Sequence, residues 1–192
     1  MFRHYSCILK HVRLNDAVRL LFDWDVNGRY VYLKRDLRKL FDENEETFND
    51  SLDRLVGSRV LERVARGVYV FAYSRNIGNA TLDLIARSLR RGELTYESLE
   101  SALSAYGVIS QIPIDRRTYM TTGRSGEVRT PYGVAEFTHT SASPEKILPE
   151  LTYPSDRGLP VASKELAWRN LKSVGRNLDL VDEKVPGDRP SR

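Results

Sequence analysis

The sequence contains few of the residues from which disulfides, metal sites and catalytic sites are usually built. Its 192 residues include one cysteine, Cys7, and three histidines, His4, His11 and His139. A single cysteine excludes an internal disulfide, and the scattered histidines have no partner at the spacing of a metal site. We therefore expect no bound metal and no cofactor.

The common catalytic motifs are missing as well. The sequence has no Gly-x-Ser-x-Gly element, no phosphate-binding loop and no His-Glu-x-x-His pair. The nearest approach to a nuclease signature is Asp182-Glu183-Lys184, which lies in a polar tail with no predicted strand around it. Because catalytic groups belong on rigid elements, the prediction is a protein that is not an enzyme.

Long hydrophobic runs are also absent. No stretch approaches the ~18 apolar residues that would span a bilayer, and the first residues lack the apolar core of a signal peptide, so we expect a cytoplasmic protein without a membrane partner. The net charge is +4, and residues 1–76 hold 14 Lys and Arg against 11 Asp and Glu. This small basic excess permits nucleic-acid binding without requiring it.

The first 76 residues have the pattern of a small helical domain with a hairpin. Apolar residues at helical spacing predict helices over 15–24, 33–41 and 45–56, with a short strand over 29–33 between the first two. Two strands follow with Arg66-Gly67 at their turn, and a polar segment over 74–79 closes the domain. This order is typical of a winged helix-turn-helix. The aromatic residues that fall at core spacing are Trp24, Phe41, Phe48, Tyr69 and Phe71.

Residues 77–192 predict a second domain of mixed composition. Helical patterns cover 81–91, 95–106 and 163–174, whereas the segment over 108–140 has the alternation and the Gly and Pro punctuation of strands. The segment over 141–160 is loop-rich, and we expect the last ~10 residues, which are charged and rich in Pro and Gly, to be disordered. The predicted fold class is therefore α+β, with an N-terminal winged helix-turn-helix followed by a mixed α/β domain.

Candidate DNA contacts lie on the second helix, the third helix and the hairpin. In a winged helix the second helix crosses the DNA backbone, the third enters the major groove and the hairpin forms the wing. Each of these charges alone is most simply explained as solvated surface, and Thr47 and Asn49 are equally well explained by helix capping and solvation. The candidate residues are Lys34, Arg35, Arg38, Lys39, Thr47, Asn49, Arg54, Arg59, Arg63 and Arg66.

The third helix is acidic, which argues against a strong grip on DNA by that helix. The run "DENEETFNDSLD" over 42–53 holds six acidic residues and no basic one. Phosphates repel such a surface, and only a few carboxylates are needed to read cytosine amino groups. We expect the second helix and the hairpin arginines, placed at Arg59, Arg63 and Arg66, to supply most of any affinity.

Four motifs, in this order, resemble those of the AbiEi-type antitoxins of bacterial type IV toxin–antitoxin systems. A Leu-Glu-Ser-Ala-Leu segment within Glu97 to Gly107 is followed by a Thr-x-x-Arg element at Thr121 to Arg124. A Phe-x-His ending at Phe137 to His139 comes next, and an Ala-x-x-Glu-x-Ala helix covers Ala162 to Ala167. The resemblance extends from about residue 15 to about residue 175. A hydrogen-bonded histidine at a strand end remains the simpler explanation of His139.

The resemblance implies a non-enzymatic antitoxin with two activities. Its winged helix would bind inverted repeats of double-stranded DNA in its own promoter and repress the operon, and the rest of the chain would counteract a nucleotidyltransferase-like toxin. The acidic third helix leaves an alternative open, a protein-binding neutralising module that has lost sequence-specific DNA binding. A phage-defence enzyme is the weakest alternative, because the sequence offers no catalytic constellation.

Overall fold

The computed structural model describes residues 12–109 and 115–180, and the chain is an α+β protein. It divides into two compact units, the N-terminal unit (Met1–Ile77) and the C-terminal unit (Gly78–Arg192). Cys7, His4, His11, the 182–184 segment and the last ten residues, for which disorder is expected, lie outside the described residues.

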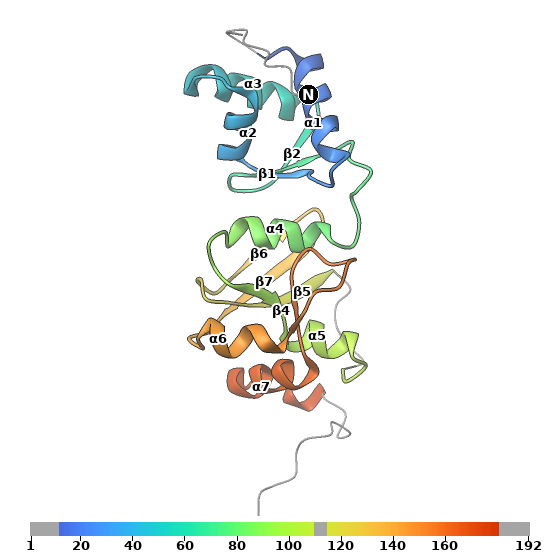
Figure 1. The fold of residues 1–192 in the computed structure, drawn as a ribbon, viewed down its shortest axis with the longest axis vertical. Helices are drawn as coiled ribbons and strands as arrows, with labels where there is room; N and C mark the ends of the chain where they lie inside the picture. Colours follow the sequence, from blue (N-terminus) through green and yellow to red (C-terminus); the bar gives the residue numbers. More distant parts are fainter. Residues whose placement is uncertain (1–11, 110–114, 181–192) are drawn as a thin grey trace, which may run out of the picture. The chain divides into compact units, whose positions relative to one another are not determined.

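Over the described residues 12–77, the N-terminal unit consists of three helices and a three-stranded antiparallel sheet with the strand order β1-β3-β2 (Figure 1). Its elements follow the order expected from the sequence, with boundaries that differ by one or two residues. They are α1 (Leu14–Asp25), β1 (Val31–Leu33), α2 (Lys34–Phe41), α3 (Glu45–Gly57), β2 (Leu61–Ala65) and β3 (Val68–Phe71).

The core of this unit joins one apolar stripe from each helix to the sheet. Leu21 of α1, Leu37 of α2 and Leu55 of α3 are fully buried, as is Phe71 of β3. Such burial stabilises each large side chain by roughly 1.5–3 kcal/mol, which is how short amphipathic helices are held in place. The sequence prediction was correct for the aromatic residues of α2, α3 and β3.

Trp24 was predicted to lie in the core, and this is wrong. Its side chain is 40% exposed, and the Arg29 guanidinium lies over its ring at 4.9 Å. The last turn of α1 buries Asp25 instead, because this carboxylate accepts hydrogen bonds from Ser74 and from Asn76, in the segment that follows β3. The hydrogen bonds of Asp25 to the segment that follows β3 thus take the place of the expected apolar contact of Trp24.

The C-terminal unit is built around a six-stranded mixed sheet with the order β6-β7-β5-β4-β9-β8. The β5–β7 and β4–β9 pairs are parallel, and the other neighbours are antiparallel. The strands are β4 (Thr95–Glu97), β5 (Arg116–Thr121), β6 (Gly126–Thr130), β7 (Gly133–His139), β8 (Leu151–Thr152) and β9 (Val161–Ala162). The helices are α4 (Thr81–Leu89), α5 (Leu99–Ala105), α6 (Pro144–Ile147) and α7 (Lys164–Val174), with 3-10 turns η1 (Leu148–Glu150) and η2 (Leu178–Leu180).

Helices cover both faces of this sheet (Figure 1). On one face, Leu82 and Ala86 of α4 pack with Tyr119 of β5 and Phe137 of β7. On the other face α5, α6 and α7 contribute the larger apolar cluster, which takes in Met120 of β5. Because successive side chains of a strand point to opposite faces, neighbouring residues of β5 serve the two different cores.

The predicted helix over 95–106 is wrong in its first third. Thr95, Tyr96 and Glu97 form β4, paired with Thr121, Met120 and Tyr119 of β5, and the helix begins only at Leu99. Its helical stripe is real, but backbone pairing with a distant strand overrides local propensity. The segment over 141–160, which was predicted to be loop-rich, carries the short elements α6, η1 and β8.

Candidate nucleic-acid interface

Helix α2 presents four exposed basic side chains. Leu37 and Phe41, four residues apart, are buried and hold the helix against the core, which turns the intervening charged positions outward. The helix ends at Phe41, and its C-cap residue, Asp42, adopts a left-handed conformation with φ 52°. The exposed basic residues of this helix are Lys34, Arg35, Arg38 and Lys39.

The start of α2 is joined to the β2–β3 turn. The turn consists of Arg66 and Gly67, and Gly67 has φ +74°, a conformation that glycine adopts without strain. The backbone N–H of Lys34 donates to the carbonyl oxygen of Gly67 over 2.9 Å. Since Leu33 also pairs with Val68, the exposed Arg66 belongs to the same edge of the unit as the first residues of α2.

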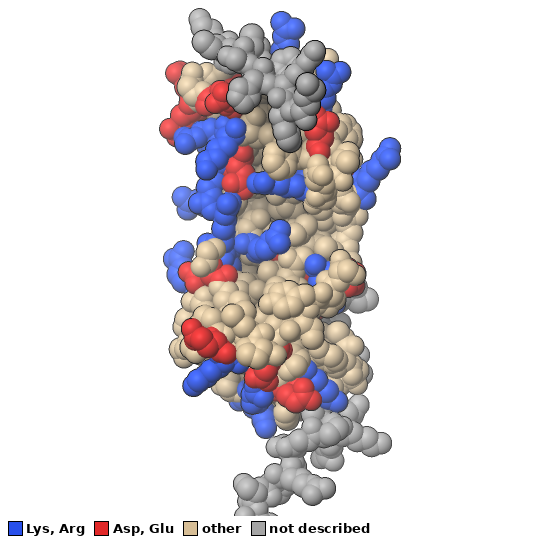
Figure 2. Space-filling view, in the orientation of Figure 1, with Lys and Arg blue, Asp and Glu red and all other residues tan. Residues whose placement is uncertain are grey.

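Figure 2 shows Lys and Arg side chains gathered on the left flank of the N-terminal unit, with acidic side chains above them. Helix α3 presents exposed acidic residues, namely Glu45, Glu46, Asp50 and Asp53. One ion pair crosses between the two helices, because Arg38 Nη1 lies 3.9 Å from Glu45 Oε2. Both side chains are more than half exposed, so this pair adds little stability.

The polar residues expected on α3 have structural contacts of their own. Asn44 is the N-cap, and its Oδ1 accepts from the Thr47 N–H over 3.0 Å and from the Thr47 hydroxyl over 2.8 Å. Thr47 therefore donates to the N-cap residue, which agrees with helix capping, the alternative to a DNA contact. Asn49 is half-buried.

Arg54 is directed at the chain that precedes α1. Its Nη2 donates to the carbonyl oxygen of Val12 over 2.6 Å and lies 3.3 Å from the Ser51 hydroxyl. Glu43 binds the same segment, because its Oε1 accepts from the Val12 N–H and from the Ser51 hydroxyl. These bonds fix the start of α1 to α3 and give the Arg54 side chain a structural role within the unit.

The predicted hairpin arginines are only partly brought together. Arg59 is not on the hairpin: it lies in the turn between α3 and β2 with φ 57°, because β2 begins at Leu61. Arg63 is exposed on β2 opposite Tyr69, and a register shift separates it from Ala65. Arg66 alone occupies the turn itself.

Arg29, which no sequence pattern indicates, also lies beside α2. Its Nη2 lies 3.3 Å from Asp36 Oδ2, and its carbonyl oxygen accepts the Tyr32 hydroxyl over 2.6 Å. Burial raises the pKa of Tyr32 although the Arg29 charge opposes it, so this phenol stays a neutral donor. Sequence spacing carries no signal for Arg29, because its contact with α2 depends on how β1 leads into that helix.

Comparisons with known proteins support the fold and no more. No family model matches the chain, and no curated protein matches it. The chain is similar to the crystal structure of the RV2827C protein from Mycobacterium tuberculosis, with a TM-score of 0.53 and 15% sequence identity. The match covers 79% of this chain and 58% of that protein, so the chain spans little more than half of its length.

The C-terminal unit contains buried carboxylates that are each paired with an arginine. Asp83 is fully buried, and its Oδ1 accepts from Arg117 Nη1 over 2.8 Å and from the Tyr119 hydroxyl over 2.7 Å. Glu100 accepts from Arg176 Nε over 3.0 Å. The first pair joins α4 to β5 and the second joins α5 to the segment after α7. Removing one partner of such a pair would leave a buried charge uncompensated.

Neither a metal-binding cluster nor a membrane-spanning helix occurs within residues 12–109 and 115–180. No group of three or more His, Cys, Asp and Glu side chains there could hold a metal ion. No helix in these ranges has both the length and the apolar character needed to cross a bilayer. His139 Nδ1 lies 2.9 Å from the Gly123 carbonyl oxygen. This contact agrees with the simpler explanation of His139, a hydrogen-bonded histidine at a strand end.

Proposed function

We propose that the N-terminal unit is a winged helix-turn-helix that binds double-stranded DNA, and that the chain is the autorepressing antitoxin of a type IV toxin–antitoxin operon. The observation that carries the DNA-binding part is the hydrogen bond from Lys34 to Gly67. It joins the basic start of α2 to the Arg66 turn. In a winged helix these are the parts that contact the DNA backbone on either side of the recognition helix.

The proposed grip on DNA is mainly electrostatic. Lys34, Arg35, Lys39 and Arg66 are exposed cations, and phosphate contacts by such side chains supply most of the salt-dependent affinity. Helix α3 would enter the major groove with a surface that is largely acidic, so its contribution is limited to a few base contacts, with Asn49 as the candidate. Affinity is therefore expected to fall steeply as salt rises.

The antitoxin part of the proposal rests on the resemblance of the C-terminal unit to AbiEi-type antitoxins. The motif at Glu97 to Gly107 covers the end of β4 and helix α5, and the motif at Phe137 to His139 ends β7. In this proposal the unit counteracts a nucleotidyltransferase-like toxin, and the N-terminal unit binds the inverted repeats of the promoter. No catalytic step is assigned to either unit.

A fluorescence anisotropy titration of the full chain tests the DNA-binding part. We expect tighter binding to a duplex that contains its own promoter than to a scrambled duplex of equal length at the same salt concentration. Equal affinities for the two duplexes would refute the repressor. The antitoxin part is tested by co-expression with the product of the adjacent reading frame: growth rescue supports it, and the absence of rescue contradicts it.

The acidic surface of α3 favours a second candidate, a module that neutralises its toxin by direct protein contact. Glu46, Asp50 and Asp53 form an exposed negative surface suited to a basic partner. Co-purification of the chain with a tagged toxin would support this candidate. If the toxin is captured while promoter and scrambled duplexes bind equally, the second candidate replaces the first.

A further inference from the structure

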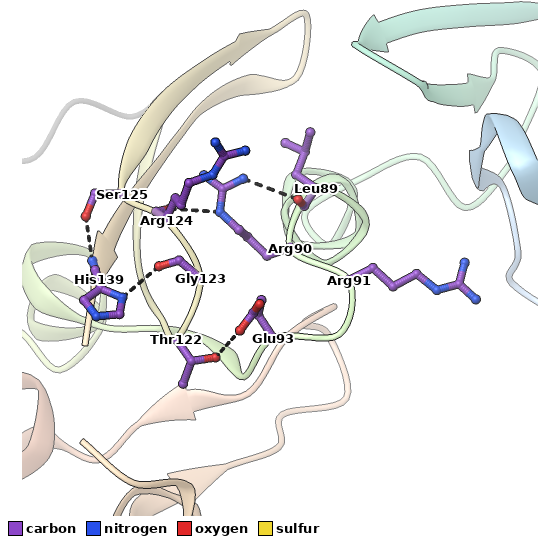
Figure 3. A pocket seen from close by; sticks show the side chains of 9 residues that line it. All are labelled: Leu89, Arg90, Arg91, Glu93, Thr122, Gly123, Arg124, Ser125 and His139. Atoms are coloured by element: carbon purple, nitrogen blue, oxygen red, sulfur yellow. Dashed lines mark hydrogen bonds between the residues drawn. The ribbon is translucent and has the colours of Figure 1, made fainter. Parts of the chain in front are cut away.

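The C-terminal unit contains a pocket of about 550 Å³ between the end of α4, the β5–β6 turn and the end of β7 (Figure 3). This volume is within the range of sites that bind small molecules. Seven of the nine lining residues have polar or charged side chains, which suits a charged ligand better than an apolar one. The lining residues are Leu89, Arg90, Arg91, Glu93, Thr122, Gly123, Arg124, Ser125 and His139.

Arg90 is held in one orientation inside this pocket. Its Nε donates to the carbonyl oxygen of Arg124 over 3.1 Å, and its Nη1 donates to the carbonyl oxygen of Leu89 over 3.3 Å. The guanidinium also lies 4.0 Å from the centre of the Phe137 ring. A guanidinium carries five N–H donors in a rigid plane. Two of these fix the orientation of Arg90, and the others remain available to a ligand.

A second cation, the Arg124 guanidinium, lies beside that of Arg90 in Figure 3, and both arginines line the pocket. Burial and, after it, the charge of Arg124 lower the pKa of Arg90, while Glu93 opposes the shift. Neither Arg90 nor Arg124 forms an ion pair with a carboxylate among the described residues. The Glu93 carboxylate instead accepts the Thr122 hydroxyl over 2.6 Å. Two guanidinium groups near each other are stabilised by an anion placed between them.

The backbone of the β5–β6 turn leaves room for this arrangement. A Cβ on Gly123 would lie 3.2 Å from Arg90 Cδ and 3.0 Å from Glu93 Cγ, so a larger residue would press on the arginine. The Ser125 hydroxyl oxygen accepts the His139 N–H over 2.8 Å, which leaves its own hydrogen to donate to a ligand. Figure 3 shows Arg91 pointing away from these groups.

We propose that this pocket binds the phosphate monoester group of a small molecule, with Arg90 and Arg124 contacting its oxygens and Ser125 donating a further hydrogen bond. A phosphate monoester carries close to two negative charges at neutral pH, which matches two guanidinium groups better than the single charge of a carboxylate or of a phosphodiester does. The volume leaves space for the organic group that bears the phosphate. The site lies within the C-terminal unit and is independent of the proposed contact with DNA.

Isothermal titration calorimetry of the full chain with AMP and with inorganic phosphate tests the proposal. We expect saturable binding of AMP, competition by inorganic phosphate and no binding of adenosine, which lacks the phosphate. Arg90→Gln and Arg124→Gln should each weaken AMP binding by about tenfold or more, because each removes hydrogen bonds to a charged group. Arg124 is exposed on a turn, so its replacement should leave the urea unfolding midpoint unchanged.

Arg87→Gln is the matched control, since Arg87 is an exposed arginine of α4 that does not line the pocket. It changes the net charge equally and should leave AMP affinity unchanged. The proposal is overturned if neither AMP nor inorganic phosphate binds, or if Arg87→Gln weakens AMP binding as much as Arg124→Gln does. It is also overturned if Arg124→Gln weakens binding to duplex DNA while AMP affinity stays as in the wild type, since the arginine would then contact a DNA backbone. If AMP and phosphate do not bind, the result of the promoter titration still stands. The proposed phosphate site and the proposed DNA binding can therefore be refuted independently of each other.

Discussion

The backbone N–H of Lys34 and the carbonyl oxygen of Gly67 are 2.9 Å apart, which joins the first turn of α2 to the tip of the β2–β3 hairpin. Lys34 has no helical partner for this N–H, because the first N–H groups of every helix lack one. The hairpin carbonyl satisfies it. The basic helix and the basic turn are therefore positioned by the same bond, and their charges are expected to act together on one ligand.

Replacement of Arg66 by alanine should weaken DNA binding by a similar factor for promoter and scrambled duplexes. An arginine at the tip of a wing more often contacts phosphate than a base, so its loss removes affinity without removing specificity. The slope of log affinity against log salt should fall by about one unit. Arg19→Ala, which removes an exposed charge from α1, is the matched control. A titration curve for Arg66→Ala that coincides with the wild-type curve would contradict the proposal that the β2–β3 hairpin is a DNA-contacting wing.

Neutralising the middle of α3 separates the two candidate functions. The double variant Asp50→Asn, Asp53→Asn removes two exposed negative charges beyond the first helical turn, so the helix dipole is little affected. If α3 faces DNA, affinity for duplex DNA should rise several-fold at low salt, because less repulsion opposes the phosphates. If α3 binds a basic toxin, capture of that toxin should weaken instead. Anisotropy and co-purification measure the two outcomes on the same protein.

Asp83→Ala should strongly destabilise the C-terminal unit. The variant leaves the Arg117 guanidinium and the buried Tyr119 hydroxyl without their common acceptor, and the Gly158 N–H also loses its bond to Asp83 Oδ2. Breaking a buried pair by removing one partner costs about 3–5 kcal/mol. Urea unfolding measures the loss, with the exposed Asp156→Ala as control. A change below about 1 kcal/mol would show that the pair does not support the fold.

The pH dependence of stability should contain a contribution from Glu97. This carboxylate is buried, and burial raises its pKa above the ordinary value of 4.5 although the Arg157 charge opposes the shift. Between the ordinary and the raised pKa the folded state keeps a proton that the unfolded state has lost. The free energy of unfolding therefore falls as pH rises through this window.

Glu97→Gln cannot titrate and should remove that slope. The difference in unfolding free energy between Glu97→Gln and the wild type should grow in favour of the variant as pH rises above 4.5, and then level off. Urea unfolding at a series of pH values measures it, with the exposed Glu165→Gln as control. A difference that stays constant over this range would mean that the pKa of Glu97 is the same in both states.

The elements of the N-terminal unit were predictable because each is defined by its own residues. The apolar stripes of α2 and α3 lie within one short segment each. Gly67 is sufficient to indicate the turn at Arg66-Gly67. The prediction of a buried Trp24 failed because the position of this residue depends on Ser74 and Asn76, which bind Asp25 from the far end of the unit. Local periodicity contains no information about that contact.

The C-terminal unit was less predictable because its sheet is assembled from distant segments. The strand β4 has a helix-compatible pattern and becomes a strand only through its pairing with β5. The two-residue strands β8 and β9 are too short for any alternation to indicate them. The pocket around Arg90 could not be predicted from the sequence either. Arg124 and His139 come from other parts of the chain than Arg90 and form no sequence motif with it.

The parallel pairing of β4 with β9 also has a consequence for biosynthesis. Glu97 is opposite Val161, and Asn170 of α7 donates to the Tyr96 and Ser98 hydroxyls, so residues made late in translation complete a strand made early. When the first 150 residues have left the ribosome, all residues of the N-terminal unit (Met1–Ile77) are available to fold. The same nascent chain still carries β4 with one open edge, available to another chain or to a chaperone until β9 and α7 emerge.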